Sequence, residues 1–169
     1  MSLKDFTKRI LPIKDKLYRF SLRIVGNVAE AEDVVQEVLI KIWSKHQEMA
    51  QYQNVEAWCM KLTKNLSIDK LRSKHKRVGM LPESYELTSK ASTPEELLQA
   101  KDTVAQIRML IAELPEKQQM IIQLRDIEEM SYQEIAVALE ISMDQVKTNL
   151  FRARKKIRAQ LINTESYGL

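Results

Sequence analysis

The stretch "MSYQEIAVALEISMDQVKTNLFRARKKIR", residues 130–158, contains two helix starts that lie eleven residues apart. Ser131 is followed three residues later by Glu134, and this is the S-x-x-E capping box that begins many helices. Ser142 is followed in the same way by Gln145. The spacing predicts a short helix, a tight turn and a second helix, which is the order of a helix-turn-helix.

The second predicted helix has one apolar stripe and one basic face. The stripe recurs at helical spacing, is expected to pack on the rest of the domain, and consists of Val146, Leu150, Ala153, Ile157 and Leu161. Residues 143–160 contain six bases and one acid. Adjacent unopposed cations repel by roughly 0.2–0.5 kcal/mol per pair, and a phosphate backbone removes that repulsion. A merely solvated face is the alternative, but the charge favours nucleic acid.

Phe151 lies opposite the apolar stripe, together with Thr148, Arg152 and Lys155. Its position allows two interpretations. The ring either packs on a neighbouring helix or contacts DNA bases, for example a thymine methyl group. Periodicity alone does not separate the two.

The whole chain has the composition of a helical protein. Three Gly and four Pro among 169 residues argue against a turn-rich β protein. The single cysteine, Cys59, excludes an internal disulfide and suits a reducing compartment. The N-terminus lacks the apolar segment of a signal peptide, and no apolar run approaches the roughly 20 residues of a membrane span. We therefore expect an all-α, cytoplasmic protein with no direct membrane insertion.

Charge and composition divide the chain into two helical domains. Residues 61–77 form a second basic patch, with seven Lys and Arg against one acid. Residues 78–94 are acidic, irregular and rich in Ser, Thr and Pro, so they predict a flexible linker, after which Thr93 and Pro94 are expected to begin the next helix. The predicted domains are residues 1–77 and residues 95–169.

The first domain is predicted to contain two long helices. The stretch "AEAEDVVQEVLIKIWSK", residues 29–45, has an apolar face made of Ala31, Val34, Val35, Val38, Leu39, Ile42 and Trp43. Ile40 lies on the polar face instead, and it marks either a protein-binding surface or a stray apolar residue. The next helix is expected to begin at Asn54 and to bury Val55, Trp58, Leu62 and Leu66.

No enzyme site is predicted. His46 and His75 have no Cys or carboxylate at metal-ligand spacing, and the phosphate-loop, nucleophile-elbow and zinc-protease motifs do not occur. Asp33 and Glu37 lie one helical turn apart, which is common for solvated groups. We therefore expect no catalytic residues, no metal and no cofactor.

Three segments together resemble a known family. They are "AEDVVQEVLIKIW", "AWCMKLTKNLSIDKLRSK" and "LPEKQQMIIQLRDIEEMSYQEIAVALEISMDQVKTNLFRARKKIR". In this order they resemble regions 2.2, 2.3–2.4 and 4.1–4.2 of the sigma-70 family, and the match is closest to the extracytoplasmic function (ECF) group. The resemblance implies a factor that binds core RNA polymerase, recognises the −35 and −10 promoter elements and promotes DNA melting.

The resemblance also implies three sets of site residues. The set expected to dock on the clamp helices of the polymerase β′ subunit is Asp33, Gln36, Glu37, Ile40 and Lys41. The set expected to bind the −10 element is Lys61, Lys64, Asn65, Asp69, Arg72 and Lys74, beside a base-capturing loop at residues 49–54. The set expected to bind the −35 element is Lys147, Thr148, Phe151, Arg152 and Lys155.

The implied partners are core RNA polymerase, through the β′ clamp helices and the β flap, and promoter DNA. No segment resembles regions 1.1 or 3, so self-inhibition through region 1.1 is not expected and a separate anti-sigma protein is the expected control.

Three positions depart from the family. Many relatives have Gly where this chain has Glu129 and Glu140, and a basic residue where it has Asn149. If both turns need positive φ, each Glu costs about 1 kcal/mol or more; otherwise the turns are built differently.

Two other classes remain as alternatives. A stand-alone helix-turn-helix regulator, acting as a dimer, would bind duplex DNA tightly without polymerase through residues 115–161. A helical adaptor with no DNA role would show no salt-dependent DNA binding.

Overall fold

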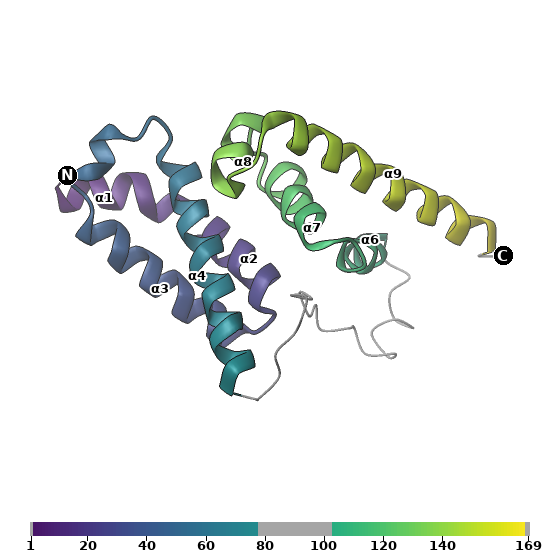
Figure 1. Ribbon diagram of the computed structural model, residues 1–169, viewed down its shortest axis with the longest axis horizontal. Helices are drawn as coiled ribbons and strands as arrows, with labels where there is room; N and C mark the ends of the chain where they lie inside the picture. Colours follow the sequence, from purple (N-terminus) through teal and green to yellow (C-terminus); the bar gives the residue numbers. More distant parts are fainter. Residues whose placement is uncertain (1, 78–102, 168–169) are drawn as a thin grey trace.

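The computed structural model describes residues 2–77 and 103–167, and every regular element in these ranges is a helix (Figure 1). The predicted all-α fold is therefore confirmed. The predicted linker, with Thr93 and Pro94, lies outside the described residues. We call residues 2–77 the N-terminal module and residues 103–167 the C-terminal module.

The N-terminal module is a bundle built around one central helix, α2. Its elements are α1 (Leu3–Ile10), η1 (Leu11–Ile13), α2 (Lys14–Val25), α3 (Val28–Ser44), η2 (Glu48–Gln51) and α4 (Val55–Arg77). Helix α2 packs against both α3 and α4, and its buried Leu17, Phe20 and Ile24 supply the centre of the core. The chain leaves α2 through Gly26 at φ 69°, a conformation that glycine adopts without steric cost.

Two expectations for the N-terminal module need correction. Helix α4 buries Ala57, Cys59, Met60, Thr63, Ser67 and Leu71, whereas the predicted Val55, Trp58, Leu62 and Leu66 are only partly buried. The shift has a packing reason: α4 is covered by α2 and α3 on one side and by α8 on another. Small polar residues allow the close approach to α2, where the hydroxyls of Ser21 and Ser67 lie 2.9 Å apart.

Trp43 was expected to be buried and is 41% exposed. Its ring meets the edge of Phe6 at 5.4 Å between centroids and stacks on His46 at 5.2 Å. Ile40, in contrast, is 68% exposed, as its place on the polar face predicts. Helix α3 also begins earlier than its apolar pattern suggested, at the N-cap Asn27, which accepts a hydrogen bond from the Glu30 amide.

The C-terminal module contains the predicted helix-turn-helix. Its elements are α6 (Thr103–Ala112), α7 (Glu116–Ile122), a π-helical turn η3 (Gln123–Ile127), α8 (Tyr132–Leu139) and α9 (Met143–Tyr167). Both predicted capping boxes are present. Ser131 and Glu134 exchange hydrogen bonds of 2.9 and 3.1 Å at the start of α8, and Ser142 and Gln145 exchange bonds of 3.2 and 3.1 Å at the start of α9.

The two turns that flank α8 both have a residue with positive φ, although a Glu occupies that position in each turn. Glu129 has φ 58° and Glu140 has φ 57°, so both adopt the left-handed conformation that glycine adopts most readily. A residue with a Cβ carries a cost of about 1 kcal/mol or more there. The alternative of differently built turns is therefore wrong.

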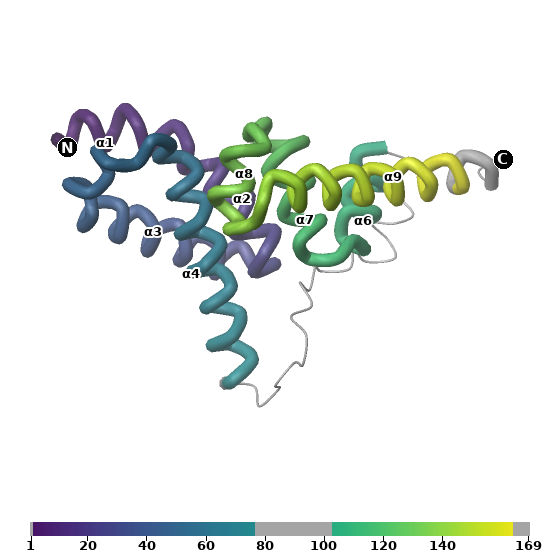
Figure 2. The backbone as a smooth tube through the Cα atoms, turned by 45° about the horizontal axis from the view of Figure 1, so that its top comes forward, coloured from purple at the N-terminus to yellow at the C-terminus, as the bar shows by residue number. Residues whose placement is uncertain are grey.

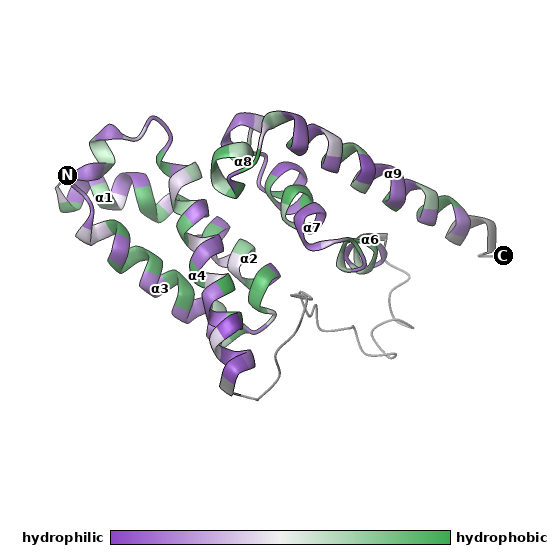
Figure 3. Cartoon of the chain, viewed as in Figure 1, coloured by the Kyte–Doolittle hydropathy of each residue, from purple (hydrophilic) through white to green (hydrophobic). Residues whose placement is uncertain are grey.

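The modules lie side by side, with α8 packed against α4 (Figure 1). Helix α9 extends away from the N-terminal module, and the C-terminal half of α4 projects beyond the rest of its own module (Figure 2). These two projecting segments are also largely hydrophilic (Figure 3). The arrangement leaves both predicted DNA-binding helices with long uncovered faces.

Candidate nucleic-acid and polymerase interfaces

Helix α9 presents its predicted DNA residues to solvent. We call Lys147, Thr148, Phe151, Arg152 and Lys155 the α9 surface; all five are exposed. On the opposite side Val146, Leu150 and Ala153 are buried, as the apolar stripe predicts. Phe151 is 68% exposed, so it is not packed into a helix–helix contact. A hollow of about 460 Å³ runs beside its ring and is lined by Tyr132, Lys147, Leu150, Arg154, Lys155 and Arg158.

Two arginines near the α9 surface hold the fold together instead. Arg154 contacts the carboxylate of Asp126, with one nitrogen–oxygen distance of 3.2 Å, and this hydrogen-bonded pair raises the pKa of Arg154. Arg125 donates to the Met130 carbonyl at 2.8 Å and lies over the Tyr132 ring, 4.5 Å from its centroid. The Arg154–Asp126 pair joins α9 to η3, whereas the contacts of Arg125 hold η3 against the start of α8. Sequence analysis did not identify them, because each joins helices through residues with no shared local pattern.

Helix α3 exposes the predicted polymerase-binding residues together. We call Asp33, Gln36, Glu37, Ile40 and Lys41 the α3 surface; all five are exposed on one face. Lys41 lies 3.6 Å from Glu37 within this face, and Asp33 lies 3.3 Å from Lys70 of α4. An exposed aliphatic side chain surrounded by hydrogen-bonding groups has the make-up of a protein-binding surface.

The predicted −10 residues follow α4, and we call Lys61, Lys64, Asn65, Asp69, Arg72 and Lys74 the α4 surface. Asn65, Asp69 and Arg72 are exposed. Lys74 lies 3.4 Å from Glu30 of α3. A groove of about 430 Å³ separates α3 from α4, and its walls include Glu37 and Lys41 on one side and Asp69 and Lys74 on the other. The α3 and α4 surfaces are therefore contiguous.

Lys61 and Lys64 are not free, which sequence analysis did not predict. Both point to the carboxylate of Glu140, at 3.0 Å and 3.5 Å. The Lys64 side chain is only 11% exposed. The hydrogen bond from Lys61 and the positive charges of both lysines lower the pKa of Glu140. The turn of the helix-turn-helix thus touches the N-terminal end of the α4 surface.

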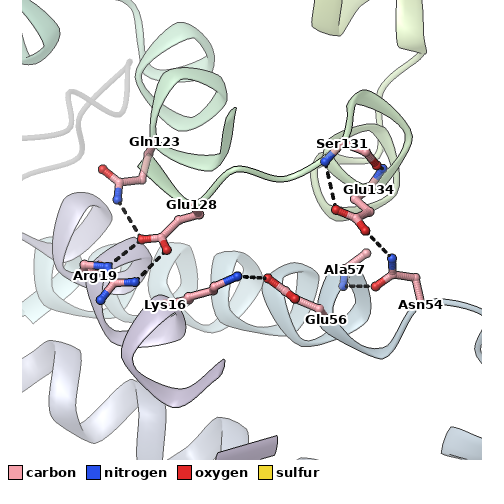
Figure 4. A network of polar contacts seen from close by, with 9 residues as sticks. All are labelled: Lys16, Arg19, Asn54, Glu56, Ala57, Gln123, Glu128, Ser131 and Glu134. Atoms are coloured by element: carbon pink, nitrogen blue, oxygen red, sulfur yellow. Dashed lines mark hydrogen bonds and ion pairs between the residues drawn. The ribbon is translucent and has the colours of Figure 1, made fainter. Parts of the chain in front are cut away.

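Two further polar contacts join the modules (Figure 4). Arg19 of α2 forms a two-pronged ion pair with Glu128, with both nitrogen–oxygen distances 2.7 Å. The Glu128 side chain is almost fully buried and also accepts from Gln123 at 3.3 Å. Asn54 caps α4 through its carbonyl oxygen, which accepts from the Ala57 amide, while its side-chain amide donates to Glu134 at 2.8 Å.

A hollow of about 480 Å³ lies where the predicted base-capturing loop meets α8. It is lined by Tyr52, Gln53, Asn54, Trp58 and Lys61 of the N-terminal module and by Ser131, Gln133, Glu134 and Val137 of the C-terminal module. Tyr52 stacks on Trp58, with ring centroids 4.9 Å apart and an interplanar angle of 17°. Met49, at the other end of the loop, is buried. The loop therefore offers an aromatic platform beside a lysine.

Residues 2–77 and 103–167 contain no group of three or more His, Cys, Asp or Glu that could hold a metal ion. None of the helices in those ranges combines the length and apolar character of a membrane span. Cys59 is buried, and burial raises the pKa of its thiol to about 12.

The exposed basic recognition helix, the second basic helix and the separate α3 surface define a class: a two-module, helix-turn-helix DNA-binding protein. Comparison with known families makes the class specific. The family model for Sigma-70 region 2 matches residues 11–77, and the model for Sigma-70, region 4 matches residues 105–157. These ranges contain the α3 and α4 surfaces in the first match and the α9 surface in the second.

Individual relatives agree. The chain is 30% identical to the ECF RNA polymerase sigma factor SigW of Bacillus subtilis, over 88% of this chain and 84% of SigW. It is also 30% identical to the ECF RNA polymerase sigma factor SigE of Mycolicibacterium smegmatis, over 90% of this chain but only 60% of SigE. The fold resembles the sigma factor RpoE of Bartonella quintana, solved in complex with the anti-sigma factor NepR, with a TM-score of 0.72, 22% identity, and coverage of 94% of this chain and 98% of RpoE.

The chain therefore belongs to the sigma-70 family, in the ECF group of RNA polymerase sigma factors. Its members are transcription initiation factors, so the sigma interpretation is favoured over the stand-alone regulator and the helical adaptor.

Proposed function

We propose that this sigma factor divides its work among the three surfaces described above. The α3 surface binds core RNA polymerase, the α4 surface holds the −10 element, and the α9 surface reads the −35 element. Residues 1–77 form the polymerase and −10 domain, residues 78–94 the linker, and residues 95–169 the −35 domain. The observation that carries the proposal is that all three predicted residue sets lie on helix faces, and that every residue of the α3 and α9 surfaces is exposed.

The α3 surface suits the β′ clamp helices because it combines one aliphatic anchor with hydrogen-bonding groups. Ile40 is 68% exposed, so its side chain is accessible to a partner protein. Asp33, Gln36 and Glu37 surround it with acceptors and a side-chain amide. Apolar anchors in a polar setting dominate the affinity of many protein interfaces. The β flap is the second expected contact on polymerase, and we assign its binding to the C-terminal module.

The α4 surface supports melting of the −10 element without nucleotide hydrolysis. Opening DNA costs a few kcal/mol per base, and stacking of an extruded base on an aromatic ring contributes about 1–3 kcal/mol in return. Tyr52, stacked on Trp58 next to Lys61, supplies a ring and a cation at the predicted loop. Binding energy from captured bases would therefore offset the cost of strand separation.

The α9 surface suits major-groove recognition by the second helix of a helix-turn-helix. Arg152 can donate two hydrogen bonds to a guanine edge, and Phe151 can contact a thymine methyl group. Lys147 and Lys155 add phosphate contacts, which release counterions and make the affinity salt-dependent. Asn149 instead donates to the Gln145 carbonyl at 2.8 Å, so it contributes to the helix and is not proposed as a phosphate contact.

Control by a separate anti-sigma protein is part of the proposal. The structural neighbour RpoE was solved with such a partner. The place of action is the cytoplasm, where core polymerase and promoter DNA are found.

The experiment is a binding test with core RNA polymerase on a sizing column. Wild-type protein is compared with the triple variant Asp33→Ala/Gln36→Ala/Glu37→Ala. The matched control is Glu113→Ala/Glu129→Ala. Like the triple variant it removes two negative charges, but from exposed positions outside the α3 surface. Complex formation by wild type and control, but not by the triple variant, supports the assignment; equal complex formation by all three proteins refutes it.

A further inference from the structure

Glu140, in the turn of the helix-turn-helix, contacts the α4 surface, which is the proposed binding site of the −10 element. Glu140 places its carboxylate 3.0 Å from Lys61 and 3.5 Å from Lys64. These are two of the cations that belong to the α4 surface. A phosphate group and this carboxylate are both anions that accept hydrogen bonds from an ammonium group, so they compete for the same two lysines.

The backbone at Glu140 makes this contact specific. Glu140 ends α8 in the left-handed conformation, with φ 57° and ψ 45°, and from this turn its side chain reaches Lys61 and Lys64. Glu129 has nearly the same φ, 58°, and is exposed, but it forms no ion pair with the described residues of α4. The chain therefore carries two strained glutamates of equal charge, and only one of them touches the proposed −10 surface.

Helix α8 covers the neighbouring loop as well. Glu134 accepts a hydrogen bond from Asn54 at 2.8 Å, directly beside the Tyr52–Trp58 stack. Val137 faces the same hollow and is 50% exposed. An extruded base approaching the aromatic platform would meet α8. The charged and the aromatic parts of the proposed −10 site are thus both in contact with the C-terminal module.

We propose that the unbound chain masks its own −10 surface, with Glu140 acting as an intramolecular phosphate mimic that DNA must displace from Lys61 and Lys64. This inference rests on the proposed role of the α4 surface. It differs from control by an anti-sigma protein, because the competing anion belongs to the same chain.

The mask is weak enough to be displaced. Glu140 is more than half exposed at its side chain, and ion pairs of exposed groups contribute little and are screened by salt. DNA offers several phosphates at once and gains affinity by counterion release. The Glu140 contact should therefore weaken the binding of single-stranded DNA to the free chain, and it should not prevent the binding of a promoter held by polymerase.

The first test measures the arrangement of the modules without DNA. Cysteines at exposed Gln47 and Asn163 carry a fluorescent donor and acceptor in the full chain, and buried Cys59 remains unlabelled. Glu140→Gln is compared with Glu129→Gln, which changes net charge equally at the same backbone conformation. We expect the closed-to-open ratio to fall about two- to fivefold in Glu140→Gln alone near physiological salt. Identical transfer efficiencies in the two variants at every salt concentration would overturn the proposal.

The second test measures masking itself. A fluorescein-labelled single strand of mixed sequence is titrated with each full-length variant, and we expect Glu140→Gln to bind about two- to fivefold more tightly than Glu129→Gln. Equal affinities would overturn the competition for Lys61 and Lys64, even if the modules separate. Neither test contains polymerase, so failure of the mask leaves the α3-surface experiment unaffected, and failure of that experiment leaves these readouts interpretable.

Discussion

Alanine substitutions at two adjacent residues of α9, Leu150 and Phe151, should have different effects: the first chiefly on stability and the second chiefly on DNA binding. Leu150 is 2% exposed and Phe151 is 68% exposed, so the first is part of the core and the second faces solvent. Leu150→Ala deletes a buried side chain and should lower the free energy of unfolding by about 2–5 kcal/mol. Full burial of a Phe side chain contributes about 1.5–3 kcal/mol, and only about one third of Phe151 is buried, so Phe151→Ala should cost about 0.5–1 kcal/mol.

DNA binding should show the reverse order of importance. If Phe151 contacts a base, Phe151→Ala should weaken −35 binding by about 1–3 kcal/mol, which is roughly 5- to 150-fold. The probe is a duplex selected from a random library by wild-type protein assembled with core polymerase, and stability is followed by urea denaturation. Equal destabilisation by the two substitutions would refute the orientation of α9. Unchanged promoter affinity in a folded Phe151→Ala protein would refute the base contact.

Three further measurements test the fold and the contacts between the two modules. Ser131→Ala removes the cap shared with Glu134 and should lower the free energy of unfolding by about 0.5–2 kcal/mol in urea; an unchanged midpoint would contradict the capping role. Because Lys61 lowers the pKa of Glu140, the stabilisation of the closed arrangement is present above the ordinary glutamate pKa and is lost as pH falls through the lowered value. Acid should therefore open the wild-type modules in the fluorescence assay, and Glu140→Gln should remove that pH-dependent step. Cys59, with a pKa of about 12, should react with a thiol reagent at pH 8 only after unfolding, and rapid labelling of the native chain would contradict its burial.

Local patterns predicted the helix-turn-helix well. Each capping box needs only residues three apart, so Ser131 with Glu134 identified a helix start that the structure confirms. The periodicity of α9 predicted the buried Val146, because one helix determines its own periodicity, but it left the environment of Phe151 open.

Contacts between modules could not be predicted in this way. Helix α4 packs on helices at several sides, so its buried face is a property of the assembled bundle and differs from the simple apolar stripe. Glu140 was identified as a departure from the family, but its ion pairs with Lys61 and Lys64 depend on how two sequence-distant segments are brought together. The same holds for Arg19 and the buried Glu128, whose ion pair has no local signature.

The most direct test of the sigma assignment is the affinity of purified protein for core RNA polymerase from its own organism, measured beside the Asp33→Ala/Gln36→Ala/Glu37→Ala and Glu113→Ala/Glu129→Ala variants. A stable complex with wild type and the control, lost in the α3-surface variant while its helical content is unchanged, is the predicted result. Failure of the wild-type protein to bind core polymerase would contradict the account.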